Sequence, residues 1–308
     1  MARQRKGLAV SGWLILDKPQ GMTSTKAVTK VRLLYGAAKA GHAGTLDPLA
    51  TGVLPIALGE ATKTVPFVVE GAKTYRFTVR FGAETDTDDA EGAIVAESAA
   101  RPSTEAIEAM LPRFTGEISQ VPPRFSALKI DGARAYDLAR DKEEFELEAR
   151  NVSVAKLSLI ERQDADHCVL EGECGKGTYV RSLARDLGRA LGAHGHVAAL
   201  RRTRVGAFGE DEAVTLAELE AAKESAAEGN ALTRWLKPIE TALRDIPFLA
   251  LSGSDAARLR QGQSVLLRGR DAPIIEGTVY ATSRGKLVAV GEMQEGELRP
   301  KRIFNLPR

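Results

Sequence analysis

One carboxylate, Asp47, stands alone in a stretch of small and apolar residues, GHAGTLDPLATGVLPIAL, which covers residues 41–58 and contains no lysine or arginine. Glycines on both sides, Gly41, Gly44 and Gly52, permit a tight backbone and the close approach of a ligand. Pro48 pushes Asp47 away from helical angles. A carboxylate taken out of water needs a cationic partner to stay charged and to act as a nucleophile. These residue types therefore favour carboxylate chemistry centred on Asp47.

A cation that could complete such a site is Arg181, in the segment GTYVRSLARDLGRALG. The spacing predicts an amphipathic helix from Thr178, with Tyr179 beside Arg181. Its apolar stripe is Val180, Leu183, Leu187 and Leu191, whereas Arg181, Arg185 and Arg189 recur along another face. The pattern alone leaves a second interpretation open, in which Asp47 caps a helix and Arg181 is one of three solvated arginines.

Other kinds of site find little support in the sequence. GEATKT lacks the second glycine of a Walker loop, and ETDTDDAEG has Asp89 where an EF-hand needs its turn glycine. His194 and His196 do not have zinc-ligand spacing with Cys168 and Cys174, and no G-x-S-x-G elbow is present. We therefore expect no metal and no cofactor.

The composition is that of an ordinary globular protein. The 308 residues are 44% hydrophobic and 27% charged, with a net charge of +2, and their number favours two domains. No apolar run is long enough to cross a bilayer, and the two cysteines lie on one face of a strand, where they are not expected to bond. We expect a cytoplasmic protein.

Several segments show which elements would position Asp47 and Arg181. WLIL (13–16) reads as a strand, followed by a helix that Thr23 or Ser24 caps. KTYRFTVRFG alternates strictly, which predicts a half-buried strand with one inward face formed by Tyr75, Phe77, Val79 and Phe81. Two strands are expected at 152–161 and 167–174, and the charged, proline-broken segment between regular elements near 119–152 is typical of a binding loop.

The central motif, GHAGTLDPLATGVLPIALGEATK, resembles the signature of the TruB family of RNA pseudouridine synthases. LILDKPQGMTS, KTYRFTVRFGAETDTDDAEG, CGKGTYVRSLARDLG and HVAALRRTRVGAF resemble further motifs of that family, in the family's order. The resemblance implies an α+β pseudouridine synthase fold, in which helices flank a mixed, mainly antiparallel sheet. It implies a catalytic domain at 1–245, with an RNA-binding flap at about 121–150, and a small PUA-like RNA-binding β domain at 246–308.

The family's activity is the isomerisation of a uridine in RNA, whose base is detached, rotated and rejoined through carbon. The resemblance makes Asp47 the nucleophile, Tyr75 the residue that stacks on the flipped base and assists proton transfer, and Arg181 the partner of Asp47. Attack on the ribose, attack on the base and elimination to a glycal all stay open. The further residues that it implies are Tyr179 and Leu200 against the base, Lys18 and Pro19 in support of the catalytic loop, and His42 inserted into the folded RNA loop.

The layout is similar to that of the bacterial stand-alone members, which implies a monomer that modifies uridine 55 in the T loop of transfer RNA without a guide RNA. Three basic clusters would supply affinity for the RNA backbone: Arg3, Arg5 and Lys6; Arg201, Arg202 and Arg204; Arg299, Lys301 and Arg302. A non-catalytic RNA-binding protein or RNA-folding chaperone on the same scaffold is the alternative.

Overall fold

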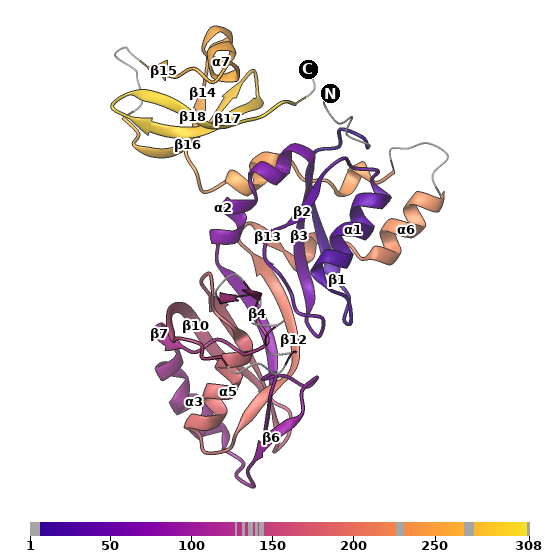
Figure 1. Ribbon diagram of the computed structural model, residues 1–308, viewed down its shortest axis with the longest axis vertical. Coiled ribbons are helices and arrows are strands. Elements are labelled where there is room, and N and C mark those ends of the chain that lie inside the picture. The colour runs from indigo at the N-terminus through magenta and orange to yellow at the C-terminus, as the bar shows by residue number, and fades with distance from the viewer. Residues whose placement is uncertain are drawn as a thin grey trace.

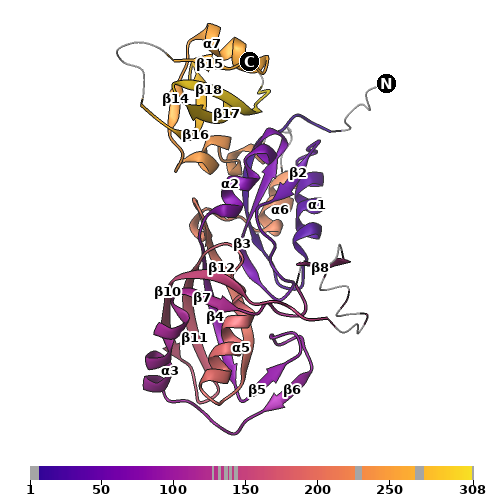
Figure 2. The same cartoon turned by 60° about the vertical axis from the view of Figure 1, so that its left-hand side comes forward.

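The computed structural model describes residues 7–126, 128–130, 133–134, 138, 141, 145–225, 231–267 and 274–306. Most of its strands form two sheets, one of nine strands and one of five. The smaller sheet lies at one end of an elongated molecule, as both Figure 1 and Figure 2 show. We propose the domain boundary between residues 245 and 246, because the last 3₁₀ turn of the larger part (Ile239–Leu243) precedes the first strand of the smaller sheet, β14 (Phe248–Ala250).

The large sheet is mixed and mainly antiparallel, as expected. Its main path runs β1-β3-β12-β4-β11-β10-β7, with β2 beside β3 and β13 beside β12. The pairing of β12 with β3 is parallel, and the other pairings in this sheet are antiparallel. The strands are β1 (Gly12–Lys18), β2 (Ala40–His42), β3 (Thr51–Leu58), β4 (Lys73–Phe81), β7 (Gly116–Gln120), β10 (Arg150–Arg162), β11 (His167–Cys174), β12 (Gly195–Val205) and β13 (Phe208–Gly209).

Strand β4 alternates as its sequence predicts. Phe77, Val79 and Phe81 are buried and share one hydrophobic cluster with side chains of helix α5 (Val180–Ala190). Burying one such side chain stabilises a fold by about 1.5–3 kcal/mol. The same face of β4 carries Tyr75 at its start, so the packing that fixes α5 on the sheet also fixes the distance between Tyr75 and the first turn of the helix.

Helix α5 begins two residues later than its pattern predicts. Tyr179 is its N-cap and has extended backbone angles. The Tyr179 amide donates to Gln120 Oε1 at 2.9 Å, and Gln120 Nε2 donates back to the Tyr179 carbonyl at 3.1 Å. This reciprocal pair holds Tyr179 outside the helix. Because Gln120 is distant in sequence, the periodicity of the helix does not predict this contact or the later start of the helix.

The other helices lie around the sheets. Helices α1 (Ser24–Leu34) and α6 (Leu216–Ser225) lie beside each other near β1 (Figures 1 and 2). Thr23 is the N-cap of α1 and accepts from the Lys26 amide at 3.2 Å, which decides between the two predicted caps. The remaining α-helices are α2 (Val65–Glu70), α3 (Thr104–Met110) and α7 (Gly253–Arg260). No helix in the described ranges is long and apolar enough to span a membrane.

The small sheet has the order β14-β16-β17-β18-β15, with α7 packed on it. Its further strands are β15 (Val265–Leu266), β16 (Gly277–Ser283), β17 (Lys286–Gln294) and β18 (Glu297–Ile303). It has its own core, with Val279, Val288, Met293 and Leu298 almost fully buried. A separate core of this kind supports the assignment of the segment as a domain of its own.

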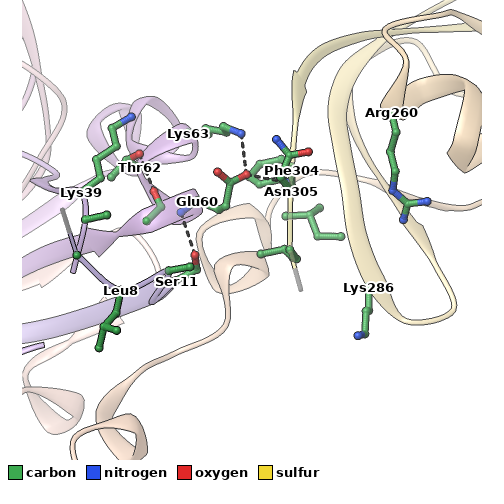
Figure 3. A pocket seen from close by; sticks show the side chains of 16 residues that line it. Leu8, Ser11, Lys39, Glu60, Thr62, Lys63, Arg260, Lys286, Phe304 and Asn305 are labelled. Carbon is green, nitrogen blue, oxygen red and sulfur yellow. Dashed lines mark hydrogen bonds and ion pairs between the residues drawn. The ribbon is translucent and has the colours of Figure 1, made fainter. Parts of the chain in front are cut away.

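The two parts meet at a large cavity of about 790 Å³ (Figure 3). Lys63 Nζ donates to the Ile303 carbonyl at 2.7 Å and lies 2.6 Å from Glu60 Oε2. The same Glu60 oxygen accepts from the Asn305 amide at 2.7 Å. These contacts join the end of β3 to the chain that leaves β18.

Two short strand pairs lie outside the two main sheets. Strands β5 (Ala83–Thr85) and β6 (Ile94–Glu97) form one antiparallel pair, and β8 (Lys129–Ile130) and β9 (Ala133–Arg134) form another within the expected flap. Much of that flap, and the cluster Arg3, Arg5 and Lys6, lie outside the described residues. Both cysteines, Cys168 and Cys174, are buried and free, which confirms the expectation that they do not bond.

Candidate active site

A pocket of about 260 Å³ surrounds Asp47 in the middle of the large sheet. It is lined by the loop before β3, by the neighbouring strands β4 and β12, by the segment that leads into α5 with the first turn of that helix, and by Val69 of α2. Strands β4 and β12 lie side by side near the centre of the molecule in Figures 1 and 2. Of the residues proposed from the sequence, the pocket brings together Asp47, Tyr75, Tyr179, Arg181 and Leu200.

The loop that carries Asp47 is held from several sides. The Ala50 amide donates to the Asp47 carbonyl at 3.1 Å, which closes a turn, and the buried Ser24 hydroxyl bonds both the amide and the carbonyl of Leu46. Gly52 has φ of 97°, and a Cβ there would lie 2.2 Å from the Arg202 carbonyl. Asp47 caps no helix, because strand β3 follows it, and its side chain is 38% exposed.

Arg181 is the cation of the pocket. Its side chain is 6% exposed, and Nε lies 3.0 Å from Asp47 Oδ2. Nη1 lies 3.5 Å from Asp89 Oδ2 and donates to the Thr87 carbonyl at 3.0 Å, while Nη2 donates to the Phe125 carbonyl at 2.8 Å. The interpretation of Arg181 as a solvated arginine is therefore wrong. Contacts on two sides fix the guanidinium, which forms an ion pair with the Asp47 carboxylate.

The acidic run ETDTDDAEG supplies the counter-ions of the arginine face of α5. Arg185 Nη1 lies 2.9 Å from Asp88 Oδ2, both side chains being buried, and Arg189 bonds Glu84. Burial raises the pKa of Asp88 to about 6, although Arg185 opposes the shift. No group of side chains suited to a metal is found among the described residues. The roles of Asp88 and Asp89 were not predicted from the sequence, where the repeat of three arginines was the available sign of acidic partners.

Arg202 lies beneath the pocket and is 1% exposed. Its guanidinium donates to the carbonyls of Val53 at 2.9 Å, Gly44 at 3.1 Å and Thr45 at 3.3 Å. The prediction that Arg202 binds RNA phosphate at the surface is wrong, because the side chain is used inside to hold the Asp47 loop. Burial raises the pKa of Tyr75, and the Arg202 charge opposes that rise.

Three other basic residues of this cluster and of β18 pair with acidic side chains. Arg201 lies 3.0 Å from Asp17 and 2.9 Å from Glu210. Arg299 pairs with Glu297 and Lys301 with Glu292, in both cases with the cation more than 60% exposed. Their contact with RNA stays a prediction.

Lys18 and Pro19 do not line the pocket, and Lys18 supports the Asp47 loop from behind. The Lys18 side chain is fully buried, and Nζ donates to the carbonyls of Met22 at 2.8 Å, Pro19 at 2.9 Å and Pro48 at 3.4 Å. Burial lowers the pKa of Lys18 to about 8, against the attraction of Asp47. The bond to Pro48 links Lys18 to the residue next to Asp47.

His42 ends β2 and does not line the pocket. Its Nδ1 is buried and has no hydrogen-bond partner among the described residues. Burial, and then the Arg202 charge, lowers the pKa of His42. Tyr179 lines the pocket from the start of α5, and burial raises the pKa of its hydroxyl. Leu200 lines it from β12.

Comparison with known proteins covers nearly the whole chain. Residues 32–180 match the TruB family pseudouridylate synthase N-terminal domain, residues 181–244 the tRNA pseudouridylate synthase B C-terminal domain, and residues 247–304 the C-terminal domain of pseudouridine synthase II TruB. A protein of Bradyrhizobium diazoefficiens named tRNA pseudouridine synthase B is 59% identical over 99% of this chain and 91% of its own length. Its namesake in Nitrobacter winogradskyi is 61% identical over 96% of this chain and 83% of its own length.

Among solved structures, the fold is similar to that in the crystal structure of a Cbf5-Nop10-Gar1 complex. The TM-score is 0.75 at 26% identity, over 95% of this chain and 84% of that one. Together with the family matches, this agreement shows that the chain belongs to the TruB family of pseudouridylate synthases.

Proposed function

We propose that this chain converts uridine 55 in the T loop of transfer RNA to pseudouridine without a guide RNA. Relatives that match it over almost its full length carry the name tRNA pseudouridine synthase B. The observation that carries the proposal is the ion pair at 3.0 Å between Asp47 and Arg181, in a pocket that Tyr75 also lines.

The reaction is an isomerisation that balances within the nucleoside. The bond between N1 of uracil and C1′ of ribose breaks, a bond between C5 and C1′ forms, C5 loses its proton and N1 ends protonated. Asp47 acts as the nucleophile, with the route of attack open among ribose, base and glycal formation. Arg181 holds the carboxylate in place, and Tyr75 stacks on the base and assists the proton transfer at C5.

The size of the pocket supports a single extruded nucleoside as its occupant. At about 260 Å³ it lies just below the usual range of about 300–1,000 Å³ for ligand pockets. Extruding a base from its stack costs a few kcal/mol, and stacking on an aromatic ring offsets about 1–3 kcal/mol of that. Tyr75, Tyr179 and Leu200 offer the surfaces against which the base would lie.

Recognition of the rest of the substrate follows from the same layout. A monomer would bind the T arm between the PUA-like domain at 246–308 and the flap at about 121–150, mainly through the shape and phosphates of the RNA. The start of that flap is tied to the pocket, because the carbonyls of Val121 and Phe125 accept from Arg185 and Arg181. Flap closure over RNA would therefore act on the arginine that holds Asp47. His42 would enter the RNA loop.

Tritium release from a T-arm stem-loop labelled at uridine C5 tests the proposal. We expect release without added guide RNA, and none when uridine 55 alone is replaced by cytidine while the label is carried by the other uridines. Tight binding of the stem-loop without release would contradict the proposal and would favour an RNA-binding protein without catalysis.

A further inference from the structure

Two cations in the wall of the Asp47 pocket, Lys73 and Arg202, are buried without a carboxylate partner. Lys73 is 6% exposed and Arg202 is 1% exposed, and in the described part of the chain neither forms an ion pair. A buried charge costs free energy unless it is paired. A pocket wall with unpaired cations is therefore suited to an anion that arrives with the ligand.

The two cations differ in how many of their N–H groups are still without an acceptor among the described residues. All three guanidinium nitrogens of Arg202 donate to carbonyls of the loop and β3. Lys73 Nζ has three N–H groups and, among the described residues, donates to one acceptor, the carbonyl of Val69. The nearby carboxylate of Glu70 forms its ion pair with Lys176. Lys73 is thus the cation of the pocket that keeps donors for a ligand.

The position of Lys73 places such a ligand beside the reacting groups. Lys73 begins β4 and lies two residues before Tyr75, so both side chains share one face of the strand. Both line the pocket, and so does Val69, the residue whose carbonyl orients the ammonium. Burial, and then the charge of Arg202, lowers the pKa of Lys73 to about 8, against the attraction of Glu70.

We propose that Lys73 binds a phosphodiester group of the target uridine and so positions the nucleoside between Tyr75 and Asp47. This inference rests on the proposed function, since the substrate there is a nucleotide with a phosphodiester on each side. Lys73 is in this account a positioning residue, because its contact is with the backbone and not with the base or the reacting carbon.

A double-mutant cycle between protein and RNA tests the contact. One change is Lys73→Met, which removes the charge and keeps the length of the side chain. The other is a neutral methylphosphonate, placed in separate stem-loops on the 5′ or the 3′ side of uridine 55. We expect Lys73→Met and the methylphosphonate at one of these two positions each to lower kcat/KM by about tenfold or more, as for a charge-assisted hydrogen bond.

The decisive measurement is kcat/KM for the combination of both changes. We expect it to lose little more than either change alone, because each removes the same contact, and we expect Lys73→Arg to restore sensitivity to the methylphosphonate. A purely structural role of Lys73, through its bond to the Val69 carbonyl of α2, would lower activity equally on the unmodified and the methylphosphonate RNAs. Full additivity at both positions would therefore overturn the proposal. Lys156→Met, an exposed lysine on β10, is the matched control and should keep the full methylphosphonate effect.

The design separates this inference from the proposed function. If the wild-type chain does not convert the unmodified stem-loop, the proposed function fails. If it converts that stem-loop and the cycle is additive, the assignment of Lys73 alone fails. Should Lys73→Met not fold, Lys73→Gln and Lys73→Arg on the same RNAs give the same comparison, with unfolding midpoints as the check on folding.

Discussion

Two cavities of this protein differ in size and in how exposed their charged side chains are. The larger, of about 790 Å³, lies where the two domains meet; Figure 3 shows Lys39 and Lys63 on one side of it and Arg260 and Lys286 on the other. The smaller, of about 260 Å³, holds Asp47 and Arg181. In the larger cavity the side chains of the Lys63–Glu60 ion pair are 27% and 19% exposed, whereas in the smaller pocket Arg181 is 6% exposed and its partner Asp47 is 38% exposed.

This difference shows why volume does not mark the reactive site. Interactions between charges strengthen as water is excluded, so a buried cation with a fixed geometry can control one carboxylate. Ions that stay hydrated contribute less and suit contacts that hold surfaces together. The small pocket has the properties that catalysis needs, and the large cavity has those of a joint between domains.

The largest effect is expected from Asp47→Asn, which removes the carboxylate that we propose as the nucleophile and nearly preserves its shape. Loss of a nucleophile that acts with partner groups lowers kcat by about 10⁴-fold or more. Tritium release from the labelled T arm measures the loss, and filter binding measures affinity, which should stay within about threefold. Release at the wild-type rate would show that the reaction takes place elsewhere.

The next largest effect is expected from Arg181→Met. Breaking a buried ion pair by removing one partner costs about 3–5 kcal/mol, and here it leaves Asp47 and Asp89 without their cation. We expect kcat to fall by about 10²–10³-fold, measured in single-turnover assays.

Arg189→Met is the matched control for that substitution, since Arg189 lies on the same face of α5 and is 53% exposed. Its kcat should stay within about twofold of wild type. Equal losses from the two substitutions would mean that Arg181 acts only through the stability of the helix. The buried position of Arg181 in the pocket would then not distinguish it from an exposed arginine.

A smaller effect, visible as a pH dependence, is expected from Lys18. Burial lowers its pKa to about 8, and a lysine loses its proton as the pH rises through its pKa. Above pH 8 the side chain then loses its charge and one donor of the three that hold Pro19, Met22 and Pro48. We expect kcat at saturating RNA to fall by about three- to tenfold between pH 7 and 9.

Lys18→Arg checks that origin, because arginine stays charged over this range. The ratio of kcat at pH 7 to that at pH 9 should approach one in Lys18→Arg, and any packing defect common to both pH values cancels in the ratio. The same decline in both proteins would assign the titration to another group.

The smallest effect is expected at the joint between the domains. Glu60→Gln weakens the ion pair with Lys63 at a partly hydrated site, which costs about 1 kcal/mol or less. Urea unfolding should detect this change, while tritium release from the T arm should stay within about twofold. A loss of turnover above tenfold would make the large cavity part of the catalytic machinery.

Local patterns in the sequence predicted the elements whose buried face is marked by their own periodicity. Strand β4 and helix α5 were predicted because alternation and the 3.6-residue repeat mark their buried faces. The motif of Asp47 and the family resemblance placed Asp47, Tyr75 and Arg181 in one site, and the pocket brings these three together.

Long-range contacts explain what the sequence did not predict. HVAALRRTRV carries three arginines, so its pattern does not indicate the central strand β12, and only the carbonyls of a distant loop make the burial of Arg202 possible. The acidic residues Asp88 and Asp89 gain their roles from arginines about ninety residues away. Lys73 likewise becomes notable only when its burial and its lack of a carboxylate partner are known.

The central claim is that the small pocket converts one nucleoside, and mapping of pseudouridine in a full-length, unmodified transfer-RNA transcript tests it most directly. After incubation with the wild-type protein and no guide RNA, chemical labelling specific for pseudouridine and primer extension locate every converted position. The account predicts stoichiometric conversion of uridine 55 and of no other uridine. Conversion of other uridines with uridine 55 unchanged would contradict it.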